Sequence, residues 1–162
     1  MGNVFCLEPE ENFPEIYGVV ASLPPWKMCY LLSKVANVEL IHEDALNTAP
    51  PPIQLVTGSS MITFEKFVWL DVENEQFIHL VQNIAKSKVK TESLVSNNTL
   101  FGDVDLDEQS FTLLSEWGDV NYLIKTEGCE DFFDPYALKN EKGIRMVLKS
   151  TVDQFKNYDK IV

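Results

Sequence analysis

The sequence predicts an α+β fold: a single domain with one mainly antiparallel sheet and two helices packed on one of its faces. Short segments rich in β-branched and aromatic residues fill the middle of the chain, and a helical pattern lies near each end. The predicted order is β-α, then a β-meander, then α-β. With 162 residues, of which 45% are hydrophobic and 23% charged, the chain can bury a sizeable core in one domain.

The first predicted elements are a strand and a helix. Residues 1–15 are acidic and contain proline, which predicts a loosely ordered lead-in. Residues 16–21 form an apolar strand. A helix is expected at 25–36, because Pro25 costs nothing in a first turn and Ser22 is a candidate cap. The apolar residues of this segment recur at helical spacing: Met28, Leu31, Leu32 and Val35.

The middle of the chain predicts a meander of antiparallel strands. A short strand is expected at 38–41, followed by a loop over 42–52 in which three consecutive prolines form a stiff connector. Strands are then expected at 53–57, 61–70 and 76–84, separated by segments rich in Gly, Ser, Asn and Asp.

The stretch 111–126 predicts a strand, a tight turn and a second strand. β-formers lie on both sides of a polar break, 115–119, that contains Gly and Asp. A helix is expected at 130–142, provided that Pro135 lies in its first turn, and Gly143 would end it. Residues 144–148 form the last predicted strand.

The charge balance and the cysteines narrow the expected classes of binding partner and the expected cellular compartment. The net charge of −12, from 25 acidic and 13 basic residues, argues against nucleic acid and against an anionic membrane surface. No run of 18 apolar residues predicts a membrane span. The three cysteines are scattered and odd in number, which favours a reducing compartment. We therefore expect a cytoplasmic protein.

An acidic stripe is the most tempting metal candidate. Asp103, Asp105 and Asp107 alternate like the first ligands of a calcium loop. Such a loop needs Gly at its sixth position and Glu at its twelfth, where this chain has Glu108 and Leu114. The apolar residues between the aspartates favour a strand with one acidic face.

Three lysines show the same alternation with the opposite sign: Lys86, Lys88 and Lys90. A hairpin turned at residues 97–98 would place Lys88 opposite Asp107. The same hairpin would place Lys90 opposite Asp105. Opposite charges across a strand pair stabilise a hairpin, so this hypothesis explains both stripes without a ligand.

No catalytic motif stands out. The two histidines, His42 and His79, lack partners at metal-ligand spacing, and no nucleotide-binding glycine motif or nucleophile elbow occurs. Arg145 is the only arginine, which disfavours anion chemistry based on several guanidinium groups. We predict no cofactor and no catalytic residue. Trp117, in the predicted turn, either folds back on the sheet or protrudes as an interface anchor, and burial of apolar surface favours the former.

Residues 114–122, LSEWGDVNY, resemble the motif of the IPExxxDY family, which are small uncharacterised proteins from Bacteroidota. Leu114 stands at the Ile position, Glu116 at the Glu and Tyr122 at the Tyr. Ser115 replaces the Pro, and Asn121 replaces the Asp. The segments 17–40 and 67–84 are similar to the family's opening strand and helix and to its central hairpin. The resemblance implies a cytoplasmic bacterial protein without an assigned activity, and it supplies no catalytic residues.

These observations predict a non-enzymatic interaction or structural protein. Its partner would be another protein or a second copy, bound through an exposed sheet edge or an aromatic patch. The motif residues Glu116, Trp117 and Tyr122 are the interaction candidates, although a Glu that caps the turn and a Tyr packed beneath it would also explain the motif. The alternative is a small-ligand or divalent-metal binding module that uses the stripe from Asp103 to Asp107.

Overall fold

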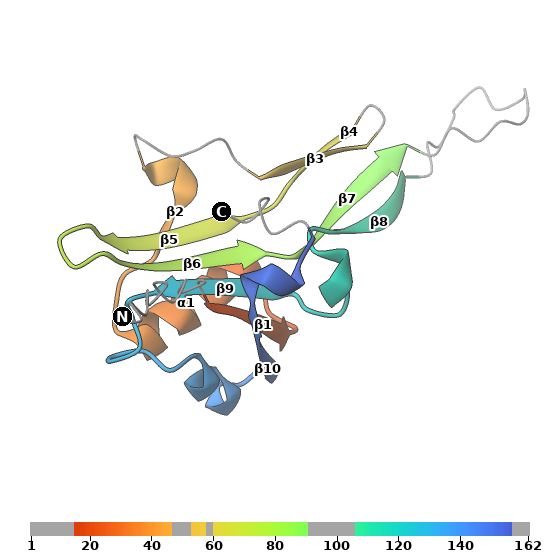
Figure 1. The fold of residues 1–162 in the computed structure, drawn as a ribbon. Coiled ribbons are helices and arrows are strands. Elements are labelled where there is room, and N and C mark those ends of the chain that lie inside the picture. Colours follow the sequence, from red (N-terminus) through yellow and green to blue (C-terminus); the bar gives the residue numbers. More distant parts are fainter. Residues whose placement is uncertain (1–14, 47–52, 58–59, 91–105, 157–162) are drawn as a thin grey trace, which may run out of the picture.

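The computed structural model describes residues 15–46, 53–57, 60–90 and 106–156, and its centre is a six-stranded antiparallel sheet (Figure 1). The strand order is β10-β1-β9-β6-β5-β2. Two two-stranded sheets, β3-β4 and β7-β8, extend from one end of it. The strands are β1 (Glu15–Ala21), β2 (Ile41–His42), β3 (Gln54–Thr57), β4 (Ser60–Thr63), β5 (Lys66–Asp71), β6 (Gln76–Gln82), β7 (Ile84–Lys90), β8 (Leu106–Thr112), β9 (Tyr122–Glu127) and β10 (Ile144–Thr151).

The helices are short apart from one. They comprise α1 (Pro25–Ala36) and the 3₁₀ helices η1 (Glu43–Ala45), η2 (Ser115–Trp117), η3 (Pro135–Asn140) and η4 (Val152–Gln154). The predicted α+β class is confirmed: the sheet is mainly antiparallel, and α1 and η3 pack on the same face of it. No helix in the described ranges has the length and apolarity needed to cross a membrane.

The helix α1 has the boundaries that its sequence predicts. Pro25 occupies the first turn, and Asn37 ends the helix in the left-handed conformation, with its N–H bonded to the carbonyl of Ser33. Ser22 is not the cap: Pro24 holds that position, and no side chain caps the helix.

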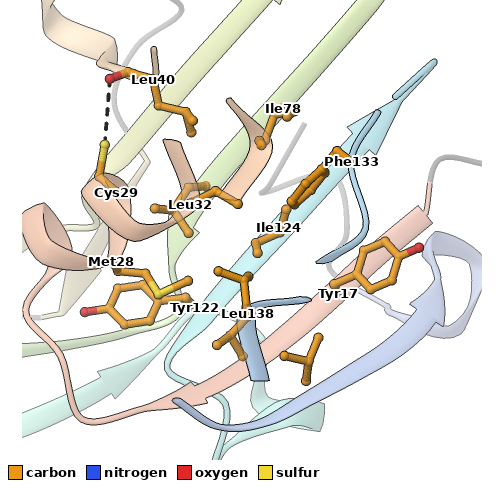
Figure 2. Packing of buried hydrophobic residues seen from close by; sticks show 14 of the residues in the cluster. Tyr17, Met28, Cys29, Leu32, Leu40, Ile78, Tyr122, Ile124, Phe133 and Leu138 are labelled. Atoms are coloured by element: carbon orange, nitrogen blue, oxygen red, sulfur yellow. Dashed lines mark hydrogen bonds between the residues drawn. The ribbon is translucent and has the colours of Figure 1, made fainter. Parts of the chain in front are cut away.

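The first core lies between the sheet and these helices (Figure 2). Met28 and Leu32 of α1 meet Tyr122 and Ile124 of β9 together with Leu138 of η3. Apolar residues alternate along β1 and β9, so every second side chain enters this core. Burial of such side chains contributes about 1.5–3 kcal/mol each.

The second core lies on the opposite face of the sheet. Ile16, Val81 and Leu123 point into it from β1, β6 and β9. Ile62 of β4 and Phe64 help to cover it, together with Trp117 of η2 and Phe155, which follows η4. The sequence did not predict η2 or η4 as helical. The sheet is thus covered on both faces.

The stretch 111–126 is not a hairpin. Its first strand, β8, pairs with β7, whereas its second strand, β9, pairs with β1 and β6. The buried side chain of Asn83, between β6 and β7, determines this path. Its amide donates to the carbonyls of Trp117 and Val120 at 2.9 and 2.8 Å, and its oxygen accepts from the N–H of Leu114 at 2.8 Å.

Other predicted elements are also shorter than expected, and the strand predicted at 38–41 is only β2, Ile41–His42. The strand predicted at 61–70 is divided into β4 and β5, because Phe64 and Glu65 carry the chain from one sheet to another. The helix predicted at 130–142 is only η3, because Pro135 cannot occupy a helix interior and begins the element instead. Asp134 caps η3 by accepting from the N–H of Tyr136 at 2.9 Å.

The predicted pairing of lysines with aspartates is wrong by one residue. β7 and β8 do pair antiparallel, but Lys88 lies opposite Glu108, and Asp107 lies opposite Val89. Within the described residues of β7 and β8, Lys86 forms an ion pair with Glu108 at 3.4 Å. Asp105, the partner predicted for Lys90, lies outside the described residues, and Lys90 is paired with Leu106 in the register.

Candidate functional site

The strand β10 forms one edge of the six-stranded sheet. It pairs with β1, and within the described ranges no strand pairs with its outer side. The opposite edge strand, β2, has only two residues, whereas β10 has eight. A long edge strand presents a row of N–H and C=O groups that can pair with another chain.

A β-bulge lies at the start of β10. Val20 pairs with Met146 and Ala21 with Ile144, so Arg145 is the extra residue on the edge strand. Bulges redirect the side chain of the extra residue, and here Arg145 lines a cleft at the end of the sheet. The sequence shows Arg145 as the sole arginine but contains no sign of the bulge.

The cleft has a volume of about 690 Å³. The carboxyl ends of β1 and β6, the amino ends of α1 and β9, and the start of β7 form its walls. Lys86 of β7 and Arg145 of β10 bring positive charge to it. No Asp or Glu is among the described residues that line it, although the chain has 25 acidic residues.

Most polar side chains in the cleft wall have partners within the protein. The hydroxyl of Tyr122 donates to the carbonyl of Leu23, and burial raises the pKa of Tyr122 to about 12, so this group stays neutral. Gln82 accepts from the N–H of Glu65 at 3.2 Å and donates to the carbonyl of Ile84 at 2.9 Å. Tyr122 and Gln82 therefore support the walls of the cleft.

In the side-chain amide of Asn121, only the oxygen has a hydrogen-bond partner among the described residues. Its Oδ1 accepts from the N–H of Ala21 at 2.8 Å, which fixes the orientation of the amide. The Nδ2 group has no hydrogen-bond acceptor among the described residues. Asn121 thus offers a donor to the cleft.

The three motif residues do not form one site. Glu116 is exposed on η2 and accepts from the N–H of Lys156 at 3.3 Å. Its own backbone N–H, and then that of Lys156, lower the pKa of the Glu116 carboxyl. Trp117 belongs to the second core, whereas Tyr122 is buried in the first.

The position of Trp117 matches the predicted folding back. Its ring packs edge-to-face on Phe155, with 4.7 Å between ring centroids. The glutamate predicted to cap the turn binds instead the segment that follows η4. These residues thus position the loop that joins β8, in the two-stranded β7-β8 sheet, to β9, in the six-stranded sheet.

Only part of the acidic stripe lies within the described residues. Asp103 and Asp105 lie outside the described residues, and of Asp107 only its strand position is known. Within the described ranges, no three His, Cys, Asp or Glu side chains gather in a way that could hold a metal ion.

A buried polar cluster lies on the face of the sheet opposite α1. Lys66 of β5 forms an ion pair with Glu43 of η1 at 3.6 Å, and both side chains are only 4% exposed. His79 of β6 and Lys125 of β9 belong to the same cluster, since both lysines act electrostatically on His79. The sequence analysis places His79 in the strand predicted at 76–84, but Glu43 only in the loop predicted over 42–52.

Comparisons with models of protein families, with curated proteins and with solved structures found no match to this chain. The resemblance to the IPExxxDY family therefore stays a prediction.

Proposed function

We propose that this protein is a non-enzymatic interaction protein that forms a homodimer through the outer edge of β10. The observation that carries this proposal is the eight-residue edge strand, which has no pairing partner on its outer side among the described residues. Antiparallel pairing of the same strand from two copies is the simplest two-fold contact for such an edge.

The side chains of β10 support a second copy as the partner. Met146 and Leu148 lie on one face of the strand and are 48% and 36% exposed, respectively. A neighbouring strand would cover both of them. When Leu148 lies opposite Leu148 of the second copy, this cross-strand apolar pair stabilises the sheet by about 0.2–1 kcal/mol in addition to the backbone hydrogen bonds.

Charge favours one register of this dimer. A two-fold axis at Val147 would place Arg145 directly opposite Lys149 of the other copy, which is repulsive. A two-fold axis at Leu148 places Leu148 opposite Leu148 of the other copy. It places Met146 opposite Ser150 of the other copy. β10 contains no acidic residue, so the high negative charge of the chain is not concentrated at this contact.

The test is the mass of the protein in solution, measured by light scattering across a concentration series. We expect the unchanged protein to reach the mass of a dimer and Leu148→Lys to remain a monomer, because two lysines would meet at the symmetry axis. Met146→Lys should weaken the dimer as well. Val72→Lys is the matched control, since Val72 is 84% exposed but lies in the turn after β5.

Two outcomes would overturn the proposal. One is an unchanged protein that stays monomeric at the highest concentration. The other is dissociation of the dimer by Val72→Lys to the same extent as by Leu148→Lys. Thermal melts of each variant establish that the protomer is still folded.

We also propose a cytoplasmic location. Cys29 and Cys129 are both buried free thiols, which is the usual state of cysteines in a reducing compartment. Fractionation of cells that produce the protein tests this expectation.

Divalent-metal binding at Asp103–Asp107 remains the alternative function. It is tested by thermal melts with calcium or magnesium. A rise in melting temperature that Asp105→Asn abolishes would favour it, and no shift at millimolar metal would remove it.

A further inference from the structure

The cleft at the end of the sheet has the chemistry of an anion site. We propose that it binds a small organic anion, a carboxylate or a phosphate ester, with Arg145 as the main contact. This inference goes beyond the proposed dimer, because the cleft belongs to a single copy of the chain.

The charges in the cleft are of one sign. Arg145 and Lys86 line it, and no carboxylate from the described residues does. Lys86 is partly neutralised by Glu108 at 3.4 Å, whereas Arg145 forms no ion pair within the described ranges. The planar guanidinium of Arg145 can donate two parallel hydrogen bonds to a carboxylate or phosphate.

The uncommitted polar side chains of the cleft all offer donors, and of these only the hydroxyl of Ser22 can also accept. Asn121 presents its Nδ2, because its oxygen is already bonded to Ala21. Gln82 and Tyr122 are engaged with protein groups and add no competing acceptor. A ligand that fits these donors must be rich in acceptors, as oxyanions are.

The amino end of α1 adds to this preference. Pro25 lines the cleft at the start of the helix, and no side chain caps that end. An uncapped helix amino terminus carries a partial positive charge that favours anions. Pro25 has no N–H, and the N–H groups of Lys27 and Met28 are bonded to the carbonyl of Pro24, so α1 adds only this dipole to the donors of Arg145 and Asn121.

The remaining walls of the cleft indicate the size and the apolar character of the part of the ligand that carries no charge. Val20, Leu23 and Ile84 contribute apolar surface beside the charged groups. The volume of about 690 Å³ lies in the range of small-molecule sites. The expected ligand therefore has one anionic group and a compact apolar part.

The experiment uses three probes: inorganic phosphate, benzoate and phenyl phosphate, each at constant ionic strength. Binding is measured by calorimetry and by the NMR signal of the Asn121 side-chain amide. We expect saturable binding of at least one aromatic anion, with a shift of that signal. Tighter binding of benzoate than of phenyl phosphate would assign the site to carboxylates, and the reverse order to phosphate esters.

Variants determine which residue carries the site. Arg145→Gln should weaken binding by at least tenfold, and Arg145→Lys should restore only part of it, because a single ammonium replaces the planar fork. Lys139→Gln removes an equal charge from η3, away from the cleft, and should leave binding unchanged.

The proposal is overturned if none of the probes shifts the Asn121 amide at tens of millimolar. It is also overturned if Arg145→Gln binds as tightly as Lys139→Gln. The monomeric variant Leu148→Lys separates this question from dimerisation. Anion binding should be retained in it, and its loss there would contradict a site built from one copy.

Discussion

The indole ring of Trp117 lies directly against the backbone of Gly18 in β1. A Cβ atom built on Gly18 would lie 2.6 Å from Cζ3 of Trp117 and 2.7 Å from Cε3. Such separations are far below van der Waals contact. Gly18 is therefore required by the close approach of the ring, and this contact attaches η2 to the central sheet.

We expect Gly18→Ala to destabilise the protein by about 1–3 kcal/mol, the usual cost of overpacking a filled core. The added methyl group would clash with the indole and disturb its edge-to-face contact with Phe155. Urea denaturation measures the loss. Combining Gly18→Ala with Trp117→Leu should cost less than the sum of the two single changes, because the smaller side chain leaves room for the methyl group.

Gly118→Ala is the matched control for this substitution. Gly118 has a helical backbone, with φ −57°, and the nearest atom to a built Cβ is 3.7 Å away. Alanine there should be neutral or stabilising by about 0.4–1 kcal/mol, because it restricts the unfolded chain. Equal losses for Gly18→Ala and Gly118→Ala would contradict a steric role for Trp117.

Asn83 controls the loop that joins β8 to β9. Asn83→Ala removes three hydrogen bonds and leaves the N–H of Leu114 and the carbonyl of Val120 buried without partners. Each buried unpaired group costs about 1–3 kcal/mol, so we expect a loss of about 3 kcal/mol or more. Chemical denaturation measures it. Hydrogen exchange at the Leu114 amide should also accelerate.

An exposed asparagine provides the comparison for Asn83. Asn74 donates to Asp71 in the turn between β5 and β6, and Asn74→Ala should cost within about 0.5 kcal/mol. If Asn83→Ala proved as mild as Asn74→Ala, the amide would not be what holds the loop. The path of 113–121 between the sheets would then depend on Leu114 and Trp117 alone.

The elements that could be predicted from sequence are those defined by local chemistry. α1 matches its expected boundaries because proline at the start and apolar spacing within are short-range signals, and the structure shows Asn37 at its end. β1 is likewise recognisable from a continuous apolar run. The class of fold follows from the order of such elements.

The pairing partner of a strand is not a local property. The pattern at 111–126 shows two strands with a break between them, but it does not reveal that Asn83, 31 residues before Leu114, directs them into different sheets. The registers of β7-β8 and of β1-β10 are equally hidden. The observed β7-β8 register differs by one residue from the predicted register, so the partner of Lys88 differs as well. The one extra residue in β10 places Arg145 at the cleft.

Replacing only one partner of the buried ion pair between Glu43 and Lys66 should destabilise the folded protein strongly. Glu43→Gln leaves the Lys66 ammonium buried without its carboxylate, and we expect a loss of about 3–5 kcal/mol. The double variant Glu43→Leu with Lys66→Met should recover most of it, because an apolar pair needs no solvation. Urea denaturation of both variants tests this expectation.

Glu39→Gln is the control for Glu43→Gln, since Glu39 is an exposed glutamate just before β2. It should change the free energy of unfolding by about 0.5 kcal/mol or less. A small loss in Glu43→Gln, similar to that in Glu39→Gln, would mean that Lys66 finds solvent or another partner when its carboxylate is removed.

His79 should make stability depend on pH in a defined window. Burial, and then the positive charges of Lys66 and Lys125, lower the pKa of His79 from 6.5 to about 4. The folded protein therefore favours the neutral ring. The stability contributed by His79 is fully present above pH 6.5 and is lost as the pH falls from 6.5 to about 4.

The free energy of unfolding should decrease by about 2 kcal/mol between pH 7 and pH 5 because of this one group. The window separates His79 from Glu15, Asp71 and Glu116, whose carboxyl pKa values are lowered and whose effects come at lower pH. Glu43 faces the same cluster from η1, and its charge opposes that of the two lysines.

His79→Gln should abolish most of this decrease, because glutamine does not titrate. Urea denaturation at pH 7 and pH 5 gives the difference for each protein. If His79→Gln kept the slope of the unchanged protein, the ring would have to be protonated in the fold despite its two cationic neighbours. The Nδ1 atom, buried and without a hydrogen-bond partner, argues against a charge at that position.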